Sequence, residues 1–157
     1  MKITLSLWMF LLAFSGVYSQ DQLPTAFELG QVNEKAYEKL IQDYNQPLLE
    51  VANYDMTKAF DNWVEMMKSV DAYAAKINFD LKGVQAFLQV FCAPDGTVDH
   101  LGYLLRPESR NFSDEKKKEL TAFFSSFCRQ YKFPLTSTRN FNHYTEATFP
   151  TVVEKAN

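Results

Sequence analysis

The sequence is poor in the residues by which catalytic and metal sites are most often recognised. Its 157 residues include only two histidines and two cysteines, which leaves few ligands for a zinc site. The spacings G-x-S-x-G, H-E-x-x-H and C-x-x-C do not occur, and neither does a phosphate-binding loop. We therefore expect no catalytic residue, no bound metal and no cofactor.

Basic charge is also scarce, and it is scattered along the chain. Without Lys2, 15 basic residues stand against 19 acidic ones, a net charge of −4. The best basic cluster, residues 116–118, is flanked by Asp114, Glu115 and Glu119. Because a nucleic-acid backbone is bound by clustered Lys and Arg side chains, we do not expect nucleic acid as a partner.

Long apolar runs are missing after the N-terminus, where none approaches the roughly 20 residues that a membrane-spanning helix needs. Residues 1–19 have the pattern of a signal peptide. Lys2 precedes the apolar run 5–14, and Val17 and Ser19 occupy the −3 and −1 positions of a cleavage site before Gln20. The predicted product has no transmembrane anchor and is exported, either to the periplasm or as a secreted protein.

Apolar residues are plentiful in what remains. Hydrophobic residues make up 46% of the chain and aromatic residues 15%, which is enough to build a core and excludes a disordered chain. The length fits one domain. We predict a single α+β domain over residues 20–157, with a helical part at 33–76 and a ββαβ part at 84–150.

The helical part consists of two amphipathic segments. Asn33 can cap a helix that Pro47 ends or kinks, and residues 48–52 can add a further turn. Asp55 can cap a second helix, whose apolar stripe has helical spacing. The stripe consists of Ala59, Phe60, Trp63, Met67, Val70 and Ala74. Two consecutive helices with a short joint predict a helical hairpin.

The second part has the period of two that is typical of strands. Residues 84–92 and 97–105 alternate in hydrophobicity, and Pro94, Asp95 and Gly96 form a turn between them. A third amphipathic helix follows from its cap, Ser113, and residues 139–149 alternate again. The thiol, carboxylates and imidazole of FCAPDGTVDH, residues 91–100, point in different directions on this pattern, so we expect them to be part of the scaffold.

This order of elements predicts a three-stranded antiparallel sheet in which strand 84–92 lies between strands 97–105 and 139–149. The third helix then covers one face of the sheet. The opposite face carries Phe87, Phe91, Val98 and Leu104, which the helical hairpin should cover. The alternative is an apolar site on this face for a small ligand or a peptide, as in cystatin-like or NTF2-like proteins.

The two cysteines are predicted to meet in the core. Cys92 lies on the inward face of its strand, and Cys128 lies near the end of the third helix, which runs back toward the same end of the sheet. In an oxidising compartment they could form a disulfide, worth about 3–4 kcal/mol. The alternative is two buried free thiols.

The last strand is predicted to have an unpaired edge. An open edge offers main-chain donors and acceptors to an extended partner segment, which can add to the sheet as a further strand. The side chains that could tune such binding alternate along it: Asn140, Asn142, Tyr144 and Glu146. They could equally serve only to keep the edge soluble and to prevent self-association.

Residues 80–150 contain the run VQAFLQVFCAPDGTVDHLGYLL, an amphipathic helix after it and a strand that ends in TFP. Together these elements resemble the C-terminal domain of TonB. The resemblance implies a small periplasmic module that pairs its edge strand with a protein or peptide partner. The membrane anchor and proline-rich linker of that family are not found in this chain.

Three functions are compatible with these observations. The first is a non-catalytic interaction module of the cell envelope, which binds a protein or peptide partner by edge-strand addition. The second is a binding protein for a small apolar ligand or a peptide, with its pocket on the sheet. The third is a hydrolase whose site has no recognisable motif. The sequence does not predict an oligomeric state.

Overall fold

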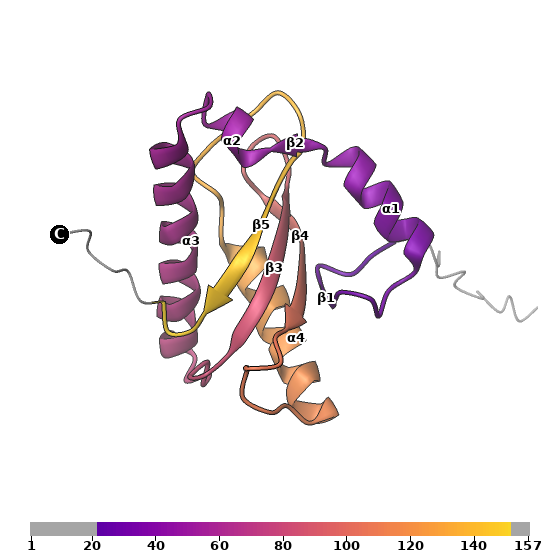
Figure 1. Cartoon of the computed structure of the whole chain (residues 1–157), viewed down its shortest axis with the longest axis vertical. Helices are drawn as coiled ribbons and strands as arrows, with labels where there is room; N and C mark the ends of the chain where they lie inside the picture. Colours follow the sequence, from indigo (N-terminus) through magenta and orange to yellow (C-terminus); the bar gives the residue numbers. More distant parts are fainter. Residues whose placement is uncertain (1–21, 152–157) are drawn as a thin grey trace, which may run out of the picture.

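The computed structural model describes residues 22–151, so the predicted signal peptide lies outside the described residues. These residues form one five-stranded sheet with helices on both faces (Figure 1). The elements in chain order are β1 (Ala26–Glu28), α1 (Glu34–Asp43), β2 (Gln46–Pro47), α2 (Leu48–Val51), α3 (Met56–Lys76), β3 (Gln85–Cys92), β4 (Val98–Leu105), α4 (Asp114–Gln130) and β5 (Phe141–Thr148).

The three predicted helix caps are confirmed. The side chains of Asn33, Asp55 and Ser113 each accept a hydrogen bond from the backbone N–H three residues further on. Each cap satisfies one of the N–H groups that have no partner inside the first helical turn. The short helix α2 is the further turn that was expected after Pro47.

The predicted turn between β3 and β4 is also confirmed. The N–H of Gly96 donates to the carbonyl of Ala93 at 2.9 Å, and the N–H of Thr97 donates to the carboxylate of Asp95 at 3.0 Å. Gly96 has φ +88°, and a Cβ atom there would lie 2.2 Å from the carbonyl oxygen of Phe133. Only glycine fits, because the turn needs both a left-handed backbone and close contact with the neighbouring loop.

The prediction of a three-stranded antiparallel sheet is wrong. The sheet is mixed and has the order β1-β4-β3-β5-β2. Strand β1 pairs in parallel with β4, and β2 pairs in parallel with β5. These two edge strands have three and two residues, which is too short for a period of two to be visible in the sequence.

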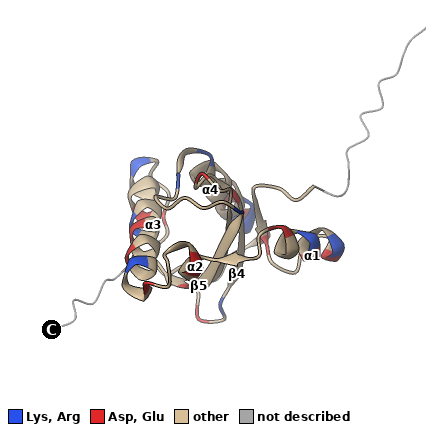
Figure 2. Cartoon of the chain, turned by 90° about the horizontal axis from the view of Figure 1, so that it is seen from above, with Lys and Arg blue, Asp and Glu red and all other residues tan. Residues whose placement is uncertain are grey.

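The predicted helical hairpin is wrong as well. Helices α3 and α4 pack on the same face of the sheet and share the main hydrophobic core with β3 and β4. Helix α1 instead lies on the opposite side of the sheet from α3 and α4 (Figure 2). There Leu40 joins Phe27 and Phe91 in a small separate cluster. The reason is the position of β2, which carries the chain along the sheet edge between α1 and α3 and so from one face to the other.

No helix within residues 22–151 is long and apolar enough to cross a membrane.

Candidate functional site

The four apolar residues predicted to form a sheet-face site do not come together. Phe91 is fully buried beneath α1, where the ring of Tyr44 lies 5.7 Å from it. Val98 belongs to the main core on the other face, because the pairing of β3 with β4 shifts between Phe91 and Cys92. Phe87 and Leu104 remain on the predicted face as direct pairing partners, and Leu104 is 48% exposed.

The reactive groups of residues 91–100 do not all point in different directions as predicted, since Asp99 and His100 both lie against Tyr44. Asp99 accepts a hydrogen bond from the hydroxyl of Tyr44 at 2.7 Å, and burial together with this bond raises the pKa of Tyr44. The ring nitrogen Nδ1 of His100 lies 2.9 Å from the carbonyl of Pro24. Asp95 pairs with Lys132 at 2.8 Å.

Cys92 and Cys128 are both buried in the main core as free thiols. Burial raises the pKa of Cys92, with a smaller contribution from Cys128 itself, and burial raises the pKa of Cys128 to about 12. Both thiols are therefore protonated at neutral pH and are poor nucleophiles. Their pairing as a disulfide stays a prediction.

The first part of the predicted binding edge on β5 is already paired within the chain. Gln46 and Pro47 of β2 lie opposite Phe141 and Asn142. The pairing is reinforced by side chains, since the amide of Asn142 donates to the carbonyl of Tyr44 and Ser137 donates to Gln46. Asn142 therefore cannot receive a partner strand, and Asn140 lies before the start of β5, so the predicted edge is wrong at this end.

Beyond Asn142 the edge of β5 is open within the part of the chain that the structure describes. Phe149 donates its N–H to Val84 on the β3 side. Because backbone groups alternate in direction along a strand, the odd-numbered residues of β5 face β3 and the even-numbered ones face outward. Tyr144, Glu146 and Thr148 thus direct their backbone groups to an edge at which residues 22–151 supply no strand.

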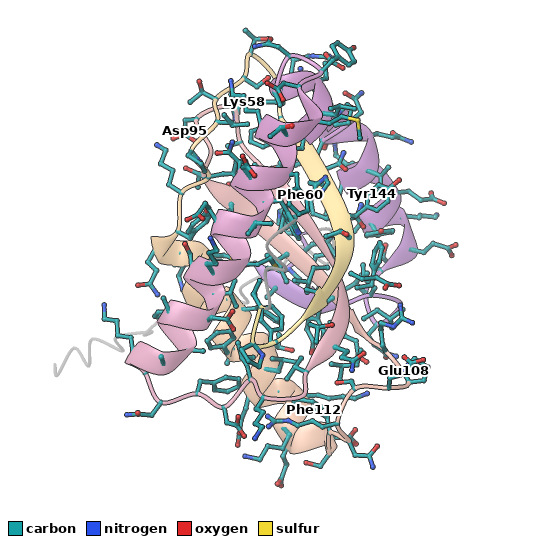
Figure 3. The ribbon with its side chains drawn as sticks, turned by 60° about the vertical axis from the view of Figure 1, so that its left-hand side comes forward. Lys58, Phe60, Asp95, Glu108, Phe112 and Tyr144 are labelled. Atoms are coloured by element: carbon teal, nitrogen blue, oxygen red, sulfur yellow. The ribbon has the colours of Figure 1, made fainter. Side chains whose placement is uncertain are left out.

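A groove of about 470 Å³ lies beside this open edge, between β5, α2 and the first half of α3. Its apolar lining includes Met56, Phe60 and Trp63 from α3, and its remaining lining residues are Pro47, Leu48, Leu49, Ala59, Asn142, His143, Tyr144 and Thr145. Figure 3 labels Phe60 on α3 and Tyr144 on β5, one on each side of this strand. The groove therefore joins free backbone groups to an apolar surface.

The exposure of the groove residues departs from the predicted core stripe. Trp63 is 5% exposed and closes the floor of the groove, but Phe60 is 61% exposed and Met56 is 75% exposed. Phe60 was expected to lie in the core because it follows the helical spacing. On α3 it instead lines the groove beside β5, where no further strand within residues 22–151 covers it.

The groove contains no charged side chain, since its lining includes no Asp, Glu, Lys or Arg. Its one titratable imidazole is that of His143, whose ring centroid lies 4.7 Å from that of Trp63. Burial lowers the pKa of His143 from its ordinary value, which keeps the imidazole neutral at pH 7. The groove is thus suited to uncharged groups.

The outer rim of the edge is polar and is held in place by contacts to the sheet. Glu146 forms an ion pair with Arg106 of the loop after β4, and the ring of Tyr144 lies 5.8 Å from that of Phe87. These contacts link the open edge to half-buried Phe87, whose pairing partner Leu104 is exposed on the second face of the sheet.

A second cavity, of about 440 Å³, lies near the start of α4 and is less suited to a ligand. Its one arginine, Arg110, is already bound by the carboxylate of Asp80 at 2.7 Å and by the carbonyl of Lys82 at 3.1 Å. The guanidinium also lies over the ring of Phe112. Its charge is therefore compensated within the chain.

The residues of the described chain offer no group of three or more His, Cys, Asp or Glu side chains that could hold a metal ion. The sequence contains one sign of the groove. Met56 has helical spacing with Ala59 and Phe60 at the start of α3, so the apolar surface of this helix is wider at its N-terminal end than a single core-facing stripe requires.

Comparisons of the chain with protein-family models, with curated proteins and with solved structures found no match. The resemblance to the TonB C-terminal domain consequently stays a hypothesis.

Proposed function

We propose that this protein is an exported, non-catalytic interaction module that captures an extended segment of a partner protein at the open edge of β5. The observation that carries the proposal is the combination of outward backbone groups at Tyr144, Glu146 and Thr148 with the apolar groove alongside. Strand addition uses this combination, because backbone hydrogen bonds supply affinity and neighbouring pockets supply specificity.

The edge of β5 is unusual for an edge strand that only needs protection from self-association. Protected edges are short, twisted or charged. Strand β5 continues for six residues beyond Asn142, and the exposed rings of Phe60 and Tyr144 lie beside this open part. Its one charged residue, Glu146, is neutralised by Arg106. These features favour capture of a partner strand over simple protection.

Site-specific photocrosslinking in the native host tests this proposal. A photoreactive amino acid at Tyr144 should form covalent adducts with a partner protein, and the same amino acid at Ile77, an exposed apolar residue at the far end of α3, should not. The variant Tyr144→Pro removes one outward N–H, so it should eliminate the adducts formed by a crosslinker at Phe60 while the protein remains folded.

Two results of the crosslinking experiment would contradict the proposal. Adducts at Ile77 that match those at Tyr144 would show non-specific contact. Adducts that persist in the Tyr144→Pro variant would show that the partner is not held by strand addition.

A further inference from the structure

The groove beside β5 has a chemistry that selects among partner strands. We infer that it binds one or two large uncharged side chains, which alternate with solvent-facing residues along an added peptide strand. The inference rests on the proposed strand addition and defines the class of peptide that the site accepts.

A strand added next to β5 would follow the geometry of the sheet. Successive side chains of a strand point to opposite faces of the sheet. On β5 itself, His143 and Thr145 face the α3 side and line the groove, whereas Tyr144 and Glu146 face the other side. An added strand must follow the same pleat, so every second side chain of the peptide enters the groove between β5 and α3.

The lack of charge in the groove limits which peptide side chains can enter it. A charged side chain entering the groove would lose hydration and would find no ionic partner among the lining residues, which makes its burial costly. The lining instead offers the indole of Trp63, the ring of Phe60 and the thioether of Met56. Aromatic and sulfur-containing groups of this kind pack favourably against large apolar side chains.

The size of the groove limits how many peptide side chains it can hold. A groove of about 470 Å³ lies within the range of about 300–1,000 Å³ that is typical of ligand pockets. It extends along β5 from Asn142 to Thr145, and successive groove-facing residues of a strand are about 6.6 Å apart. This length admits one or two groove-facing side chains and no longer series.

Selection from a phage-displayed library of random short peptides on the immobilised protein tests the inference. Enriched peptides should carry a large uncharged residue at every second position. Their affinity should fall by roughly tenfold or more for Phe60→Lys, as it does when an apolar anchor is lost. Affinity should also fall for Tyr144→Pro and stay unchanged for Ile77→Lys, a matched exposed apolar position outside the groove.

The peptide selection distinguishes a failure of the groove preference from a failure of strand addition. Peptides that lose binding to Tyr144→Pro but lack the alternation and tolerate Phe60→Lys would overturn the groove preference and leave strand addition standing. Peptides that still bind Tyr144→Pro would overturn strand addition and this inference with it. An absence of enriched peptides would overturn both. Concentration-dependent self-association that Phe60→Lys abolishes would identify a second copy as the occupant instead.

Discussion

At the scale of single residues, His143 connects the groove to the stability of the fold. Its ring packs against that of Trp63 with the two centroids 4.7 Å apart, and the side chain is largely removed from water. Burial disfavours the charged imidazolium and so lowers the pKa of His143. The residue is therefore both part of the groove wall and a group whose protonation opposes folding.

The lowered pKa of His143 predicts a loss of stability in mild acid. The unfolded chain binds a proton at the ordinary histidine pKa of about 6.5, whereas the folded chain binds it only at lower pH. The contribution is therefore fully present above about pH 6.5 and is lost as the pH falls through the folded-state pKa. Urea denaturation between pH 7 and 5.5 should show this fall in the free energy of unfolding.

Two variants test the assignment of this pH dependence to His143. His143→Gln should flatten the pH dependence, and His100→Gln, which leaves the groove intact, should retain it. An unchanged pH dependence in His143→Gln would contradict the assignment.

At the scale of the element, β5 has two inequivalent backbone rows. The row of odd-numbered residues is paired with β3 along the whole strand. The row of even-numbered residues is paired with β2 only at Asn142, where Pro47 ends the short strand and α2 begins. One strand is therefore both a structural member of the sheet and a candidate binding surface.

This alternation predicts opposite effects of proline at adjacent positions. Thr145→Pro removes an N–H that faces β3, so it should lower the free energy of unfolding by about 2 kcal/mol or more. Tyr144→Pro removes an N–H that faces outward, so its cost should stay below about 1 kcal/mol. Urea denaturation of both variants measures the difference, and equal costs would mean that the rows are assigned incorrectly.

At the scale of the whole molecule, the two faces of the sheet are covered very unequally. One face carries α3 and α4 and the main core. The other face carries α1, in which Leu40 is the buried residue. The hydroxyl of Tyr37 on α1 also donates a hydrogen bond to the side chain of Gln89 at 2.6 Å. Less buried apolar area means less local stability, so α1 should open before the rest of the fold.

Hydrogen exchange measured by mass spectrometry tests whether α1 is less stable than α3. The amides of α1 should exchange roughly tenfold or more faster than those of α3, which corresponds to about 1.4 kcal/mol of local stability. Leu40→Ala should accelerate exchange in α1 further, whereas Ile41→Ala, on the exposed side of the same helix, should change it little. Equal protection of α1 and α3 would show that α1 is an integral part of the core.

The sequence by itself determined the elements that depend on local patterns. The caps at Asn33, Asp55 and Ser113 could be predicted because each hydrogen bond spans only three residues. The turn at Gly96 and the long strands β3, β4 and β5 could be predicted because glycine conformation and alternating hydrophobicity are visible within a few neighbouring residues. The same patterns placed Cys92 and Cys128 in the core.

Only the tertiary structure decided where those elements lie and which surfaces stay open. Strands β1 and β2 are recognised by their pairing partners, Leu101 to Tyr103 and Phe141 to Asn142, which are distant in the sequence. The position of β2 separates α1 from α3, pairs part of the predicted edge and leaves Phe60 outside the core. The candidate groove follows from these contacts, because exposure depends on which segments of the chain meet, and an apolar spacing does not encode that.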